Sequence, residues 1–332
     1  MRLPRLRFTV RLSMLMILLV GLALGWPVVK ARKQAEAVAA VQRLKGSLVF
    51  DCDVNSLGRH APNSRPPQVP RWLQDALGPE FFRTIYTVWV YRKVPDSELT
   101  FLQGLTELRT LHLAGTDVSD AGLSFLKSMP RLWGLDLMRC PLIGDDSARE
   151  IGGLAELKEL YLSGTQFSDV GLSCLRGKDR LRILFLSDLR VTDAGLANLE
   201  GLTGLKAVSL NGTQVTDDGL AVLKRMSALR QLGLSRTRVT DDGLALLDGK
   251  TGLFELNLEG TRVTDAGLIH LSGLTGLQDL HLNDTQLTDA GLDQLKGLTG
   301  LKLLRLDRTR VTQVGVAGLQ KALPSTKITW GN

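Results

Sequence analysis

The sequence predicts an α/β solenoid, a curved stack of strand–helix units that follows an N-terminal transmembrane helix. Three observations support this fold class. Aligned leucines recur every 24 residues, and each recurrence carries a strand pattern followed by a helix pattern. The 332 residues are 44% hydrophobic but only 5% aromatic, and they include 34 glycines. A period of this length indicates a supersecondary unit that buries its apolar face against its neighbours.

Residues 1–30 are predicted to form a cytoplasmic tail and a transmembrane signal-anchor helix. Residues 12–29 carry no charge and would span about 27 Å as a helix, close to one hydrocarbon core. The arginine-rich tail ahead of them favours a single-pass membrane protein with its repeats outside the cytoplasm. A cleaved signal peptide ending near Ala23-Leu24-Gly25 is the alternative. Gly21 and Gly25 form a GxxxG pair, which leaves open a weak homodimer contact within the membrane.

The segment between the predicted transmembrane helix and the repeats is divided into two parts at residue 70. Residues 31–70 are expected to form a juxtamembrane helix ending at Gly46, a short strand over 47–53 and a proline-rich linker. Residues 71–104 are expected to form an N-terminal cap, with a helix over 71–78 and a strand over 84–91. The helix is indicated by the helical spacing of Ala35, Val38, Val41 and Leu44. Four aromatic residues should cover the first repeat: Trp72, Phe81, Phe82 and Trp89.

Residues 105–332 are predicted to be the repeat domain, including a C-terminal cap. In each unit an LxLxL segment alternates like a strand and a GLxxLxxL segment has helical spacing. A Thr or Ser such as Thr216 should cap the helix, and the Asp after it favours the helix start electrostatically. Trp330 in a last strand over 328–330 should close the core. The aligned leucines are Leu108, Leu132, Leu157, Leu181, Leu205, Leu229, Leu253, Leu277 and Leu301.

Two further columns indicate close packing between units. Eight units keep a glycine inside the helix pattern, from Gly122 to Gly315, although glycine costs about 1 kcal/mol against alanine there. We therefore expect a close backbone approach that a Cβ would block. A second column of threonines should point inward and satisfy backbone groups of the turn; Cys140 and Leu189 interrupt it.

The pattern LxxLxLxxTxVTDxGLxxLxxL resembles the leucine-rich repeat family over about residues 85–330. Its Thr-containing, 24-residue unit is similar to the GALA and cysteine-containing subclasses. A basic anchor followed by such units resembles the envelope-anchored leucine-rich repeat proteins of some bacteria. The resemblance implies a right-handed horseshoe with a parallel sheet on the concave face, helices on the convex face, and a partner bound by the concave face.

Composition argues against several other functions. Residues 1–45 contain nine of the 41 Lys+Arg and one of the 34 Asp+Glu, so the remaining 32 basic and 33 acidic residues balance and no nucleic-acid partner is expected. Cys52, Cys140 and Cys174 form no metal pair, and the four histidines do not cluster along the sequence. We expect no metal, no cofactor and no catalytic site.

The candidate site is the outward column of the strands, which runs from His112 to Thr329. Tyr161 and Phe185 are adjacent in it and are the expected aromatic anchors. The later half of the face is polar and acidic, and an arginine column follows the turn edge at residues 190, 238, 262 and 310. The predicted partner-binding residues are Tyr161, Phe185, Glu255, Asn257, Glu259, Asp279, His281, Asn283, Arg305 and Asp307.

The sequence is compatible with three functions. The first is a non-catalytic, membrane-anchored protein that binds an unknown protein or envelope component. The second resembles the F-box leucine-rich repeat adaptors of ubiquitin ligases and would need a folded F-box within residues 30–84. The third is an enzyme with its site in residues 47–84, where Asp51, Cys52, Asp53 and His60 lie; that segment offers little core to exclude water.

Overall fold

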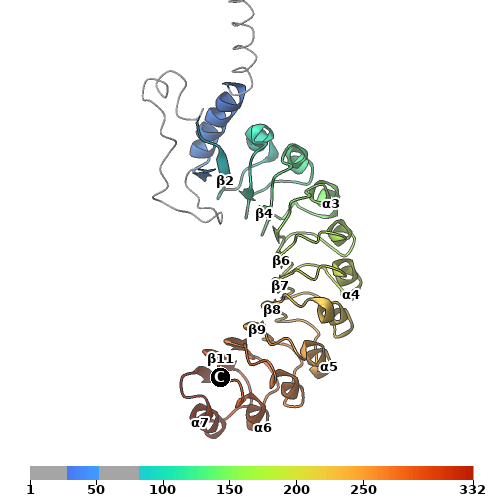
Figure 1. Cartoon of the computed structure of the whole chain (residues 1–332), viewed down its shortest axis with the longest axis vertical. Coiled ribbons are helices and arrows are strands. Elements are labelled where there is room, and N and C mark those ends of the chain that lie inside the picture. The colour runs from blue at the N-terminus through green and yellow to red at the C-terminus, as the bar shows by residue number, and fades with distance from the viewer. Residues whose placement is uncertain (1–27, 52–81, 332) are drawn as a thin grey trace, which may run out of the picture.

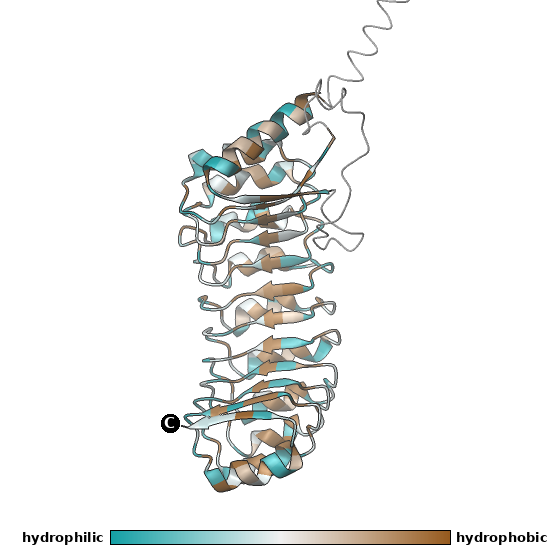
Figure 2. Ribbon diagram, turned by 90° about the vertical axis from the view of Figure 1, so that its left-hand side faces the viewer, coloured by the Kyte–Doolittle hydropathy of each residue, from teal (hydrophilic) through white to brown (hydrophobic). Residues whose placement is uncertain are grey.

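The structure is a computed structural model that describes residues 28–51 and 82–331. The chain forms an arc of stacked units with one sheet along its concave side and short helices along its convex side (Figure 1). All twelve strands belong to that sheet in sequence order, so each unit lies beside its sequence neighbours. In Figure 2 the strands follow one another like the rungs of a ladder.

The strands of the repeats pair in parallel, whereas β1 pairs with β2 antiparallel. Most are three residues long, as the LxL core of each unit predicts. The strands are β1 Ser47–Phe50, β2 Ile85–Trp89, β3 Thr110–His112, β4 Gly134–Asp136, β5 Glu159–Tyr161, β6 Ile183–Phe185, β7 Ala207–Ser209, β8 Gln231–Gly233, β9 Glu255–Asn257, β10 Asp279–His281, β11 Leu303–Asp307 and β12 Lys327–Gly331.

The convex elements are shorter and tighter than the helix pattern predicts, and many are 3₁₀ helices (η). The α-helices are α3 Ala148–Gly152, α4 Asp193–Leu196, α5 Asp241–Leu244, α6 Asp289–Leu292 and α7 Gln313–Ala322. The 3₁₀ helices are η3 Asp96–Gly104, η4 Ala121–Ser128, η5 Asp145–Ser147, η6 Gly171–Leu175, η7 Ala197–Leu199, η8 Asp218–Arg225, η9 Ala245–Leu247, η10 Gly267–Leu271 and η11 Asp293–Leu295.

The N-terminal cover of the stack comes from a different segment than the sequence predicts. A helix over residues 28–43 packs on the first units, with Ala37, Val41 and Leu44 in the common core. The Gln34 amide accepts from the N–H of Ile85 at 2.9 Å and ties the helix to β2. Ala35 is exposed, because the buried face of the helix includes Gln34 instead.

The predicted aromatic cover is wrong at Trp89. Trp89 pairs in register with His112 and lies on the concave face, because Val88-Trp89-Val90 already follows the repeat's alternation. Phe82 is partly buried, while the predicted helix over 71–78, Trp72 and Phe81 lie outside the described residues.

The predicted transmembrane segment, except for its last two residues, also lies outside the described part of the chain. Within residues 28–51 and 82–331, no helix is long and apolar enough to cross a bilayer.

The threonine column points inward as predicted. Thr237 is buried, and its hydroxyl donates to the carbonyl of Leu234 at 2.6 Å, as its counterparts do in six other units. Cys140 fills the same position and donates through Sγ to the Leu113 carbonyl at 3.1 Å. Burial raises the pKa of the Cys140 thiol, so it stays a neutral packing group.

The aspartates at the helix starts connect successive units. Asp193 accepts from the backbone N–H of Thr216 at 2.8 Å and from its hydroxyl at 2.7 Å. A Cβ on Gly219 would collide with the same carboxylate. The predicted close approach is therefore confirmed, but the neighbour is a side chain of the preceding unit rather than its backbone. The same Asp–Thr/Ser bonds begin at Asp96, Asp145, Asp169, Asp217, Asp241, Asp265 and Asp289.

The turn after each of the strands β3 to β11 has one residue in the left-handed conformation, and this residue alternates between glycine and a charged residue from Gly115 to Asp284. The φ angles of these residues lie between 54° and 72°. Glycine suits that conformation, and a charged residue there carries a strain of about 1–2 kcal/mol. The charged side chain lies over the next glycine: a Cβ on Gly260 would meet Arg236 Cγ at 3.2 Å. The column runs Gly115, Arg139, Gly164, Asp188, Gly212, Arg236, Gly260, Asp284 and Arg308.

The C-terminal end is less closed than predicted. The final strand forms, but Trp330 is 41% exposed and does not seal the core. Trp330 pairs in register with the inward Leu306, yet no described element packs on its far side. Ile328 contributes partial cover at the same end.

Candidate binding surface on the concave face

The sheet places one outward side chain of each strand in a single row along the concave face. His112 pairs with Asp136, which in turn pairs with Tyr161 on the next strand, and the register continues in this way to Thr329 on β12. Because side chains alternate across a strand, the flanking leucines point to the core and this row points outward. The predicted row is confirmed, and Trp89 extends it by one strand.

The first half of the face is aromatic. The Trp89 and His112 rings are stacked with their centroids 5.2 Å apart. Tyr161 and Phe185 meet edge to face, with centroids 5.1 Å apart and an interplanar angle of 78°. Such arrangements suit the quadrupoles of the rings. The predicted adjacency of Tyr161 and Phe185 is therefore observed, and both side chains remain partly exposed.

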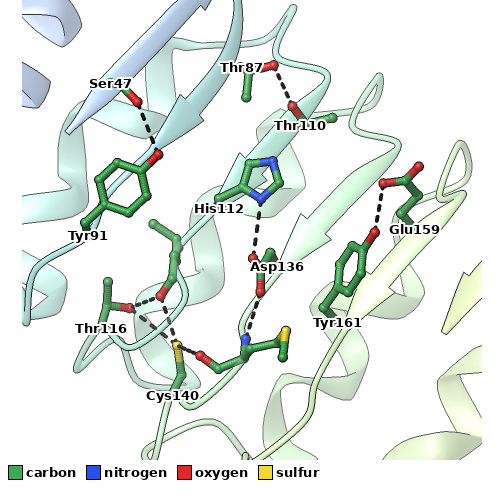
Figure 3. Close-up of polar contacts among 12 residues, drawn as sticks. Ser47, Thr87, Tyr91, Thr110, His112, Thr116, Asp136, Cys140, Glu159 and Tyr161 are labelled. Carbon is green, nitrogen blue, oxygen red and sulfur yellow. Dashed lines mark hydrogen bonds and ion pairs between the residues drawn. The ribbon is translucent and has the colours of Figure 1, made fainter. Parts of the chain in front are cut away.

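Polar contacts hold these rings in place (Figure 3). The Tyr161 hydroxyl donates to Glu159 Oε2 at 3.2 Å, and His112 Nδ1 lies 3.4 Å from Asp136 Oδ2. Burial, followed by the charge of Glu159, raises the pKa of the Tyr161 hydroxyl, so it remains a neutral donor. These contacts orient the Tyr161 and His112 side chains on the concave face.

The second half is polar, and seven of its eight predicted residues lie at the surface. Glu255, Asn257, Glu259, Asp279, His281 and Asp307 are partly exposed, and Arg305 is exposed. Burial, followed by the charge of Arg305, lowers the pKa of His281, which keeps this imidazole neutral at pH 7.

Asn283 is the exception, and its assignment as an exposed partner-binding residue is wrong. It is 6% exposed, and its Oδ1 accepts from the backbone N–H of Asp307 at 3.0 Å. Asn211 occupies the equivalent position and accepts from the N–H of Ser235 at 2.8 Å. Both asparagines therefore satisfy the turn of the following unit.

Two features of the face were absent from the sequence-based site. Trp133 lies just before β4, with Lys158 Nζ 5.9 Å from its ring centroid, a cation–π distance. A row of basic residues occupies the same position in the following units. The sequence shows this row in the residue that precedes each strand. The alternation of inward and outward residues leaves that residue at the border of the concave face.

The turn-edge arginines are exposed, as expected for solvated side chains. Arg190, Arg238, Arg262 and Arg310 are all exposed, and Arg238 reaches Gln214 Oε1 at 3.5 Å. This edge also holds the charged turn residues, of which Arg236 and Arg308 pair with Asp188 and Asp284.

The metal-ligating and thiol side chains of the described residues were the candidates for a reactive group. No group of three or more His, Cys, Asp or Glu within them is arranged to hold a metal ion. Burial raises the pKa of the Cys174 thiol to about 11, which disfavours the nucleophilic thiolate. Of the predicted catalytic alternative in residues 47–84, only Asp51 is described among the named side chains, and it accepts from the N–H of Thr84 at 2.9 Å.

Comparisons with known proteins identify a family model and solved structures that are similar to this chain. A family model described as "Leucine Rich repeat" matches residues 105–127 and 156–175. Internalin C2 of Listeria monocytogenes superposes with a TM-score of 0.50 and 24% identity over 63% of this chain and 83% of its own. A second internalin of that bacterium has a TM-score of 0.46 and 22% identity over 74% of this chain and 86% of its own. No curated protein sequence matches the chain.

Proposed function

We propose that this chain, as a member of the leucine-rich repeat family, is a non-catalytic binding protein. Its concave face holds a protein or envelope partner. Residues 12–29 tether it to a membrane as a single-pass anchor, and the repeats lie outside the cytoplasm. The proposal for the anchor is supported by sequence alone, through an uncharged stretch of the required length behind an arginine-rich tail.

The observation that carries the binding proposal is the edge-to-face pair of Tyr161 and Phe185 on the open side of the sheet. Partly exposed aromatic residues with constrained rings lose little conformational entropy on binding and commonly dominate interface energies. Neither side chain belongs to the leucine core, so the fold itself does not account for their presence at the surface. The stacked Trp89 and His112 extend the same surface.

The test is a Tyr161→Ala/Phe185→Ala variant of the full-length protein, used as bait in solubilised membranes. Loss of the two rings should lower partner capture at least tenfold, which corresponds to about 1.4 kcal/mol or more. Trp330→Ala is the matched control, because it removes an exposed aromatic side chain from the C-terminal end. Equal capture by the double variant and the control would refute this face as the binding site.

The tether has its own test. The full-length protein should stay with membranes after alkaline extraction, and protease added to intact cells should digest the repeats. Replacing two central leucines, Leu18 and Leu19, by arginine should release the protein into the soluble fraction, since each charge at a helix centre costs about 2.5–3.5 kcal/mol. A wild-type protein that alkaline extraction removes from membranes would contradict the anchor.

A further inference from the structure

The concave face changes the sign of its charge halfway along the stack. Each unit presents three outward strand-side residues and the residue just before the strand. In the units of β6, β7 and β8 the charged members of this set are Arg182, Lys206 and Arg230, with no acidic residue among them. In the units of β9 and β10 they are Glu255, Glu259 and Asp279, with no lysine or arginine. A basic block thus borders an acidic block.

The basic block is a continuous row. Backbone N–H groups of Lys206 and Arg230 donate to the carbonyls of Arg182 and Lys206, so the three residues occupy equivalent positions on consecutive strands, about 4.8 Å apart. Their charges are not used within the fold. Arg182 Nη1 and Arg230 Nη1 donate only to nearby backbone carbonyls, and within the described residues no ion pair involves any of the three.

The acidic block likewise keeps its charge. Glu255 accepts from the neutral amide of Gln231 at 2.6 Å, and Glu259 accepts weakly from Asn283 at 3.5 Å. His281 lies between these carboxylates, and the lowered pKa of its imidazole leaves it neutral at pH 7. The centres of the two blocks are about 12 Å apart along the sheet, which exceeds the Debye length of about 8 Å at physiological ionic strength. Arg230 and Glu255 lie on neighbouring strands where the two blocks meet, so a ligand along the sheet meets first one sign of charge and then the other.

We infer that the concave face selects a protein partner with segregated charge, one that places acidic side chains on Arg182, Lys206 and Arg230 and basic side chains on Glu255, Glu259 and Asp279. This inference rests on the proposed function and specifies its partner. A polyanion such as a nucleic acid or an acidic glycan would be attracted by the first block and repelled by the second. A protein surface carries both signs at this spacing and gains from both blocks.

Two synthetic peptides of identical composition test the inference. One carries about four glutamates, a Gly-Trp-Gly spacer and about four lysines, since an extended chain advances about 3.3 Å per residue. The other alternates the same charged residues around the same spacer. Binding to the full-length protein in detergent is measured by fluorescence anisotropy at low salt, and the segregated peptide should bind about tenfold more tightly, a difference of about 1.4 kcal/mol. Equal binding of the two isomers would overturn the inference, as would tighter binding of polyglutamate or heparin than of the segregated peptide.

Charge reversal provides the matched controls. R182E/K206E/R230E replaces the basic block by an acidic one, so the variant should lose the preference for the segregated peptide and instead bind a lysine-only peptide most tightly. R190E/R238E/R262E changes the net charge equally on the turn edge and should leave the preference within about twofold of wild type. An equal loss in both variants would attribute binding to net charge and refute the inference. If the peptides are not discriminated while partner capture still requires Tyr161 and Phe185, the inference fails and the proposed function stands.

Discussion

At the scale of single residues, aspartate carboxylates connect successive units. Each accepts hydrogen bonds from a backbone N–H and a hydroxyl group of the next unit. Asp193 receives two bonds from Thr216, and Gly219 leaves the space that its carboxylate fills. This accounts for the glycine at the equivalent position of eight units, where intrinsic helix propensity disfavours it. The glycine column is a packing requirement between units.

Gly219→Ala should therefore destabilise the protein by about 1–3 kcal/mol, because the new methyl group overlaps Asp193. Gly318→Ala is the matched control, since a Cβ there meets no atom within 4 Å and alanine should stabilise α7 by about 1 kcal/mol. Urea unfolding measures both. In Asp193→Ala/Gly219→Ala the loss should be smaller than the sum of the single losses. A neutral or stabilising Gly219→Ala would disprove the role assigned to the glycine column.

At the scale of elements, the last helix begins at the same kind of aspartate contact between units. Asp289 accepts from the N–H of Thr312 at 2.7 Å and from its hydroxyl at 2.6 Å, at the start of α7. These bonds, with the hydroxyl contributing most, lower the pKa of Asp289. A carboxyl with a lowered folded-state pKa stabilises the fold above its unfolded pKa of about 3.9, and that contribution is lost as the pH falls through the lower folded-state value.

Thr312→Val should raise the pKa of Asp289 toward its ordinary value, because it removes the largest cause of the shift. The carboxyl carbon chemical shift of Asp289, followed by NMR between about pH 2 and pH 6, measures this change. Stability should then depend less steeply on pH below about 4 than in wild type. An unchanged Asp289 titration in Thr312→Val would show that the hydroxyl bond does not control this group.

The structure within one unit could be predicted from the sequence, whereas the contacts between units could not. The strands and inward leucines follow from alternation within one unit, which is why β3 to β12 lie where the pattern indicates. Contacts between units cannot be read from that pattern: Asp193 and Thr216 are 23 positions apart, and nothing local links them. Asn283 was misassigned for the same reason, because its partner is a turn N–H of the next unit. Trp330 was misassigned because a pattern within a strand does not reveal that the next layer is missing.

At the scale of the whole molecule, the stack is a one-dimensional series of contacts. Within residues 28–51 and 82–331 each strand pairs only with its sequence neighbours, and one continuous core runs from residue 37 to residue 323. Stability in such a series is approximately a sum over units and the interfaces between them. Damage to one unit should therefore spread first to the nearer, shorter end.

Leu258→Asp would bury an unpaired charge at a site that is fully inaccessible, at a cost of several kcal/mol. We expect a lower melting temperature by circular dichroism, and loss of hydrogen-exchange protection in β9 to β12 before β3 to β7. Leu258→Met keeps the volume and should cost less than about 1.5 kcal/mol. An unchanged melt for Leu258→Asp would refute the register of the core, and simultaneous loss of protection in all strands would refute the nearest-neighbour description.

The alternation of glycine and charged residues at the left-handed turn positions has a consequence for how this chain can vary in length. Removing one unit from the middle would put two glycines, or two bulky side chains, side by side. Removing two units would restore the original order, because each large side chain again lies over a glycine. Between Gly115 and Asp284, shortened or lengthened forms that fold well should therefore differ by pairs of units, which makes the 48-residue doublet the natural module of this scaffold.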